Sequence, residues 1–209
     1  MTEPLFKEFN PVSAKQWKQK IQFDLKGADY NDTLTWKSNE GITVKPYYHS
    51  DDFETLPEVS NTQATQWRIS QTIFVANVEK SNLKAIDSIK RGAESIKFII
   101  PKQEVSIKDL LQNIDTKITT LHFELQFISE VYVENMFSIT SAKNTYIHSD
   151  IIGNLAKTGN WFNTLNNDFS VYKKQYQITK SITINTSLYQ NAGANMVQQF
   201  AYSLSHANA

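Results

Sequence analysis

The first clear pattern of apolar positions along the chain is that of a helix. Three large apolar residues recur at intervals of four: Trp17, Ile21 and Leu25. This spacing places them on one face of a helix. Ser13 can cap the start of this helix because Gln16 stands three residues later, and Gly27 can end it. Residues 28–66 show only turns and short extended pieces. Residues 1–66 are therefore predicted to form a helix followed by an arm that wraps around another surface.

From residue 67 onward, strand-like and helix-like patterns alternate. The runs typical of strands are residues 67–75, 95–100, 119–127, 146–151 and 181–187. Apolar residues at helical spacing lie between them, in residues 83–89, 107–114, 129–139 and 168–177. Parallel strands joined by helical crossovers form either an open doubly wound sheet or part of an eight-stranded α/β barrel. A turn at residues 188–194 then leads into a final amphipathic helix.

The alternation of side chains within these strands favours the barrel. Parallel strands that helices cover on both faces normally read as continuous apolar runs. Here Leu121 and Phe123 alternate with His122 and Glu124, which gives one apolar and one polar face. A polar inner face suits the interior of a barrel. The predicted fold is therefore α/β: residues 67–209 form a partial TIM-type (β/α)8 barrel of about five parallel strands, cut off after the fifth, whose first and last strands are exposed edges.

The composition excludes several classes of function. The 209 residues carry 21 basic and 21 acidic side chains, so the attraction that drives binding to nucleic acids or anionic membrane surfaces is missing. The first residues lack the pattern of a signal peptide, and no apolar run approaches the ~20 residues of a membrane span. The absence of cysteine excludes disulfides and a cysteine nucleophile. We expect a cytoplasmic protein that binds neither nucleic acid nor membrane.

Polar residues on the predicted strands are the main candidates for chemistry. They are Lys97, His122, Glu124, His148 and Asp150. Two interpretations stay open. In the first, these side chains pair with one another and fill the barrel interior, because buried charges persist only when partnered. In the second, the last four bind a cation, although no histidine of the chain shows the His-x-x-x-His spacing of a metal site.

Two further motifs each allow two interpretations. Trp36, Tyr47 and Tyr48 could stack on a nucleic-acid base, or could anchor the arm on a barrel or a partner subunit. Residues 191–194, Asn-Ala-Gly-Ala, could start a phosphate-binding helix, or Gly193 could permit a tight turn. The neutral charge of the chain and the single glycine favour the second interpretation in each case.

Four segments of the chain occur in the same order in a known family. They are Trp36 with Glu-Gly-Ile-Thr-Val-Lys-Pro-Tyr at 40–47, Trp-Arg-Ile-Ser-Gln at 67–71, Asn-Thr-Tyr-Ile-His-Ser-Asp-Ile at 144–151, and Tyr-Gln-Asn-Ala-Gly-Ala at 189–194. With these segments the chain resembles the adenosylcobalamin-dependent acyl-CoA mutases, and within them the small subunits of methylmalonyl-CoA mutase. The resemblance implies an eight-stranded barrel followed by a cobalamin-binding domain. The Asp-x-His-x-x-Gly segment that supplies the cobalt ligand in the family is missing here. Adenosylcobalamin is therefore expected in a partner large subunit and not in this chain.

The catalytic positions of the family can be compared with this chain one at a time. The resemblance implies a tyrosine on the first strand, where Thr72 stands, and a glutamine on the fourth strand, where His148 stands. It implies an arginine after the fourth strand, where the chain has Thr158. A Tyr-His pair at the end of the fifth strand is replaced by Ser187 and Leu188. No catalytic, cofactor-binding or metal-binding residue is therefore expected in this chain.

These departures predict a non-catalytic structural subunit. The chain would be the N-terminal part of a small subunit that forms a heterodimer with a large subunit, which interconverts methylmalonyl-CoA and succinyl-CoA. Self-association through the exposed barrel edges is a second way to cover those edges. The alternative function is an acyl-CoA-binding module, or an active mutase, that uses its own barrel mouth.

Overall fold

The structure is a computed structural model that describes residue 6, residues 8–55 and residues 67–209. The chain divides into two compact units, Met1–Thr65 and Gln66–Ala209. Each unit is described by itself below.

Unit 1 begins with the predicted helix, α1 (Ala14–Asp24), and the capping box between Ser13 and Gln16 is present. A short helix, α2 (Tyr30–Leu34), follows, and Asp29 caps its start. Strand β1 (Trp36–Lys37) pairs antiparallel with β2 (Thr43–Val44). The last element is the 3-10 helix η1 (Ser50–Asp52).

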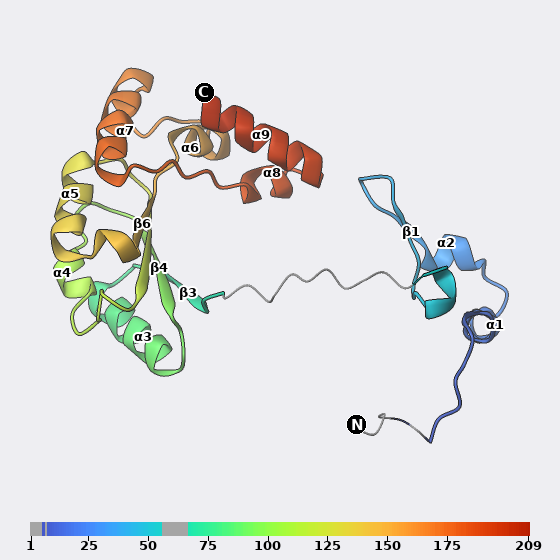
Figure 1. The fold of residues 1–209 in the computed structure, drawn as a ribbon. Helices are drawn as coiled ribbons and strands as arrows, with labels where there is room; N and C mark the ends of the chain where they lie inside the picture. The colour runs from blue at the N-terminus through green and yellow to red at the C-terminus, as the bar shows by residue number, and fades with distance from the viewer. Residues whose placement is uncertain (1–5, 7, 56–66) are drawn as a thin grey trace. The chain divides into compact units, whose positions relative to one another are not determined.

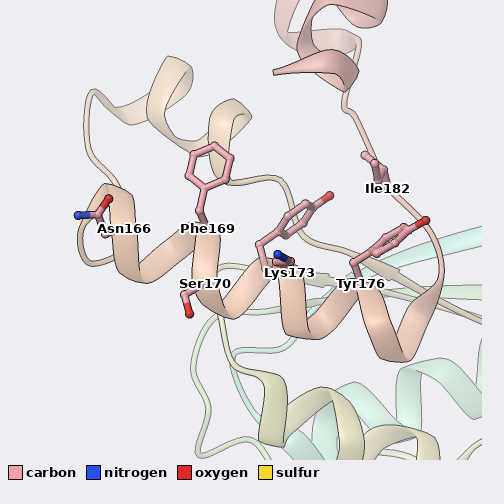
Figure 2. Close-up of a pocket in the computed structure, with 7 residues that line it drawn as sticks. Asn166, Phe169, Ser170, Lys173, Tyr176 and Ile182 are labelled. Carbon is pink, nitrogen blue, oxygen red and sulfur yellow. The ribbon is translucent and has the colours of Figure 1, made fainter.

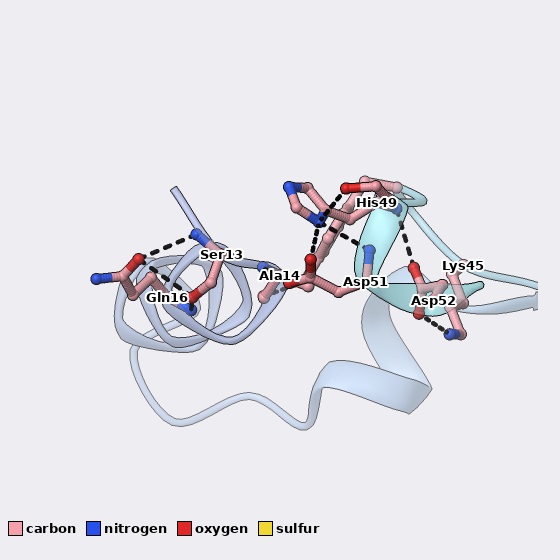
Figure 3. A network of polar contacts seen from close by, with 9 residues as sticks. Ser13, Ala14, Gln16, Lys45, His49, Asp51 and Asp52 are labelled. Atoms are coloured by element: carbon pink, nitrogen blue, oxygen red, sulfur yellow. Dashed lines mark hydrogen bonds and ion pairs between the residues drawn. The ribbon is translucent and has the colours of Figure 1, made fainter. Parts of the chain in front are cut away.

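Polar contacts hold the elements of unit 1 together (Figure 3). The backbone N–H of Ala14 donates to Asp51 Oδ2 at 3.1 Å, which joins α1 to η1. Lys45 Nζ lies 3.0 Å from Asp52 Oδ1, and Tyr47 donates its hydroxyl to the Ala14 carbonyl at 2.7 Å. Tyr30 is the one buried side chain among the described residues of this unit. The described part of unit 1 therefore has almost no apolar core.

Unit 2 contains a four-stranded parallel sheet in the order β3–β4–β5–β6 (Figure 1). The strands are β3 (Ser70–Phe74), β4 (Ser95–Ile100), β5 (Thr120–Leu125) and β6 (Thr145–His148). The register places one row of apolar residues side by side across the sheet: Ile73, Phe98, Phe123 and Ile147. This row is buried, so it marks the core face of the sheet.

Helices cover the core face, which Figure 1 shows. These helices are α3 (Val78–Lys90), α4 (Ile107–Leu110) and α5 (Glu130–Ile139), and their buried residues join the core of the sheet. Helix α7 (Leu165–Thr179) packs beside α5, and its Gln175 donates to the Ser129 carbonyl at 3.0 Å. The 3-10 helix η2 (Ala142–Asn144) precedes β6. The remaining helices are α6 (Ile151–Thr158), α8 (Ser187–Asn191) and α9 (Met196–Asn208).

The structure confirms the predicted α/β class with a parallel sheet but corrects the number of strands. Residues 181–186, predicted as the fifth strand, lie in no strand or helix. They run beside β6 through side-chain contacts: the Thr183 hydroxyl donates to the Ile147 carbonyl at 3.2 Å, and Asn185 N–H donates to Asp150 Oδ2 at 3.4 Å. The described sheet therefore has four strands, is open, and forms no closed barrel.

A second correction concerns the end of the fourth predicted strand. Residues 149–151 were predicted to extend the strand, but β6 ends at His148 and α6 starts at Ile151. The reason is local: the side chain of Asp150 accepts a hydrogen bond from Gly153 N–H at 2.6 Å and caps the helix.

Candidate functional site

The face of the sheet opposite the core carries most of the candidate polar residues. The register places four residues in one row across this face: Thr72, Lys97, His122 and Tyr146. The next row along the strands contains Glu124 beside His148. Burial alternates accordingly along β4 and β5, with the residues of the core face buried and the central residues of the polar face only partly covered.

These polar side chains form two direct pairs. Lys97 Nζ lies 2.6 Å from Glu124 Oε2, and the two side chains are 31% and 30% exposed. His122 Nδ1 and His148 Nε2 share a hydrogen bond of 3.0 Å, and the two rings stack at 5.2 Å between centroids. The Tyr146 ring also stacks on His122, at 4.9 Å between centroids. The polar face is thus an organised cluster in which charge is balanced within the sheet.

The surroundings of the two histidines favour their neutral forms. The pKa of His148 is lowered to about 4, mainly by burial and also by the nearby His122 and Lys97, while Glu124 acts in the opposite direction. Burial and the positive charge of Lys97 also lower the pKa of His122. Both imidazoles are therefore neutral near pH 7, and one ring donates its N–H to the other.

Asp150 belongs to a separate chain of hydrogen bonds that reaches the last helix. His206 Nε2 lies 2.9 Å from Asp150 Oδ1, and the Tyr189 hydroxyl lies 2.8 Å from His206 Nδ1. The side chains of His206 and Asp150 are only 5% and 18% exposed. A Cβ atom added at Gly153 would lie 2.2 Å from Asp150 Oδ2, so any other residue there would displace this carboxylate.

A pocket of about 540 Å³ opens where β5 and β6 end and α6 begins. Polar side chains of the strands and of α6 line this pocket together with apolar side chains of the segments that follow. Its lining includes Lys97, His148, Asp150, Thr158, Thr183 and Leu188. Its size and its mixture of polar and apolar groups suit a small organic molecule.

The structure brings together three of the five positions that the resemblance singles out. His148, Thr158 and Leu188 line the pocket, and the Thr158 hydroxyl donates to the Asn154 carbonyl at 2.8 Å. Thr72 is exposed on the edge strand β3 and does not line it. Ser187 is exposed at the start of α8, where its hydroxyl donates to Asn185 Oδ1 at 2.6 Å.

The arrangement gives no support to a cation site. Glu124 is bound to Lys97 and Asp150 to His206, so the four candidate ligands are divided between separate contacts. Within the described residues, no group of three or more histidine, aspartate or glutamate side chains could hold a metal ion.

Sequence reasoning missed Tyr189 and His206 as members of the site. His206 lies 56 residues from Asp150 along the chain. A single histidine on a C-terminal helix shows no local pattern from which such a distant partner could be predicted.

A second hollow, of about 470 Å³, lies along α7, and Figure 2 shows residues that line it. Phe169, Tyr172 and Tyr176 recur at helical spacing and face Ile182 across the hollow. Burial raises the pKa of Tyr172 above its usual value. The lining is mainly apolar, with Ser170 and Lys173 among its residues. None of the described helices combines the length and the apolar composition that a membrane span requires.

Comparison with known proteins agrees with the resemblance. The chain is 35% identical over 136 residues to a protein of Porphyromonas gingivalis (strain ATCC BAA-308 / W83) named methylmalonyl-CoA mutase small subunit. The matched region covers 58% of this chain but 22% of that relative. No family model matches the sequence. The predicted similarity to such small subunits is thereby confirmed, over a stretch that is a small part of the relative's length.

Proposed function

We propose that this chain acts as a non-catalytic structural subunit, or as part of one, in an assembly of the methylmalonyl-CoA mutase type. The proposal is supported by one observation: the three pocket residues at catalytic positions of the family, His148, Thr158 and Leu188, are each held by a neighbouring group or are apolar. His148 is held by His122, and the Thr158 hydroxyl is held by a backbone carbonyl. Leu188, the third pocket residue at a catalytic position of the family, has no polar group at all.

The histidines also give no support to cobalamin binding by this chain. His122 and His148 bond to each other, and His206 lies between Tyr189 and Asp150. His49 Nδ1 accepts the N–H of Asp51 at 3.2 Å. Each of the four histidines of the chain thus makes at least one contact within the described residues, and only His206 has both ring nitrogens engaged. Adenosylcobalamin is assigned to the partner large subunit in this proposal.

Unit 1 supports a role in binding another protein. Its described residues bury Tyr30 alone, while Phe23, Trp36 and Tyr48 are 78%, 63% and 56% exposed. Aromatic side chains at this level of exposure are typical of surfaces that a partner covers. We assign this surface to the contact with a large subunit.

Turnover by the isolated chain tests the catalytic half of the proposal. The purified chain is mixed with adenosylcobalamin and methylmalonyl-CoA, and the formation of succinyl-CoA is followed by chromatography. We expect no product above the level of a reaction without protein. Product that depends on the chain alone would overturn the proposal.

Binding to a large subunit tests the other half. The chain and a candidate large subunit are mixed and their association is measured by analytical ultracentrifugation. Trp36→Ala should weaken this association by about tenfold or more, which is the effect expected at an aromatic anchor. The matched control is Lys37→Ala, since Lys37 is an exposed neighbour on the same strand β1. Equal affinity for the wild type and Trp36→Ala would contradict the assignment of this surface.

The pocket itself favours a second candidate, a module that binds an acyl-CoA without converting it. Its volume of about 540 Å³ fits a small ligand group, and His148 and Thr158 line it. Equilibrium dialysis of the chain with methylmalonyl-CoA distinguishes the two candidates. Saturable binding without turnover supports the second, and no binding leaves the structural role.

A further inference from the structure

We infer that the C-terminal helices form a lid over the pocket, and that the Tyr189–His206–Asp150 chain of hydrogen bonds holds this lid closed. The lid consists of residues 181–208: the irregular segment 181–186 followed by α8 and α9. This inference concerns motion at the pocket and does not depend on whether the chain is catalytic.

The first argument is the weak attachment of the lid to the rest of unit 2. Neither α8 nor α9 contains a buried residue. The apolar side chains of α9 are instead exposed, with Val197, Phe200 and Leu204 at 73%, 68% and 56%. An element with so little buried apolar surface opens at a low free-energy cost.

The second argument is that polar contacts from the lid converge on one carboxylate. His206 Nε2 contacts Asp150 Oδ1 at 2.9 Å, and Asn185 N–H donates to Asp150 Oδ2 at 3.4 Å. Tyr189 fixes the other nitrogen of His206 at 2.8 Å. Because the side chain of His206 is 5% exposed, water is largely excluded from this contact, which strengthens it.

The third argument is the position of the lid. Thr183, Ile184, Asn185 and Leu188 all belong to it, and all line the pocket. Figure 1 shows α8 and α9 beside α6, whose start carries Asp150. Movement of the lid away from Asp150 would therefore remove one wall of the pocket. Lys180 and Ser181 lie between the end of α7 and the pocket-lining residues and belong to no helix or strand, so they can act as the hinge.

The absence of cysteine in this protein allows a direct measurement of lid opening. Leu188→Cys places a single thiol on the inner side of the lid, and its rate of reaction with a maleimide reports opening. Tyr189→Phe removes a hydroxyl from the contact while it keeps the ring beside Tyr202. It should raise the labelling rate several-fold. His206→Ala should raise the rate by at least about tenfold, the effect of losing a hydrogen bond to a charged group.

Two controls separate lid opening from other effects. Ser205→Ala changes an exposed residue of the same helix and should leave the rate unchanged. A second single thiol, Val133→Cys, lies in the core at 0% exposure and should stay protected in every variant. If His206→Ala and Tyr189→Phe leave the labelling of Leu188→Cys unchanged, the inference is overturned. It is also overturned if the core thiol becomes reactive at the same rate, because His206 would then stabilise the whole unit.

Discussion

The pair of histidines on the polar face makes the stability of unit 2 depend on pH. The perturbation is His148→Gln, which removes the titrating group while an amide remains to hydrogen-bond with His122. Burial lowers the pKa of His148 from 6.5 to about 4 in the folded protein. Above pH 6.5 the residue is neutral in both the folded and the unfolded states. Between pH 6.5 and 4 the unfolded chain binds the proton more readily, so the free energy of unfolding falls as the pH falls.

The magnitude follows from this difference. Each pKa unit corresponds to about 1.4 kcal/mol, so the lowering to about 4 sets an upper limit of about 3 kcal/mol. Solvent reaches part of the ring, and screening reduces the expected effect to about 1–2 kcal/mol. The wild type should therefore lose about 1–2 kcal/mol more than His148→Gln when the pH is lowered from 7 to 4.5.

The assay is urea unfolding at the two pH values, followed by circular dichroism. Tyr146→Phe is the matched control, because it keeps the stacking on His122 and leaves both histidines in place. The loss of unfolding free energy that Tyr146→Phe causes relative to the wild type should be the same at both pH values. An equal pH dependence for the wild type and His148→Gln would refute the assignment of a low pKa to this histidine.

Two further predictions concern the sheet. Phe98→Ala should lower the free energy of unfolding by about 3–5 kcal/mol in urea unfolding, because Phe98 is fully buried and stacks on Phe123. The control Phe74→Ala changes a 53% exposed residue and should lower it by less than about 1 kcal/mol. Similar losses for the two variants would show that the core does not lie on the face of the sheet that carries Phe98. A double-mutant cycle with Lys97→Met and Glu124→Gln should give a coupling energy of about 1 kcal/mol for the 2.6 Å contact, and a coupling of zero would show that the two charges do not interact in solution.

Much of the fold followed from local patterns in the sequence. The spacing of Trp17, Ile21 and Leu25 and the Ser13–Gln16 cap predicted α1, which the structure places at Ala14–Asp24. The alternation in β5 predicted which face of the sheet meets helices, and the structure buries Leu121 and Phe123 on that face. The prediction that the chain alternates strands and helices after residue 66 holds for four strands.

The candidate site was only partly predictable. The polar strand residues identified the cluster of Lys97, His122, Glu124 and His148, and the structure pairs them. The positions taken from the resemblance named three pocket residues, His148, Thr158 and Leu188. The lid contact at His206 was missed because its partner Asp150 is 56 residues away.

The sequence by itself therefore determined the features that a local repeat of side chains specifies: helix α1 in unit 1, and the apolar faces of β4 and β5 in unit 2. These depend on side-chain periods of two or 3.6 residues and need no distant partner. Only the tertiary structure decided that residues 181–186 form no strand and that β6 ends at His148. The reason is that Ile182 and Ile184 have strand spacing, but a strand also needs a neighbour whose backbone groups are in register, and here side-chain contacts to Ile147 and Asp150 fill that edge.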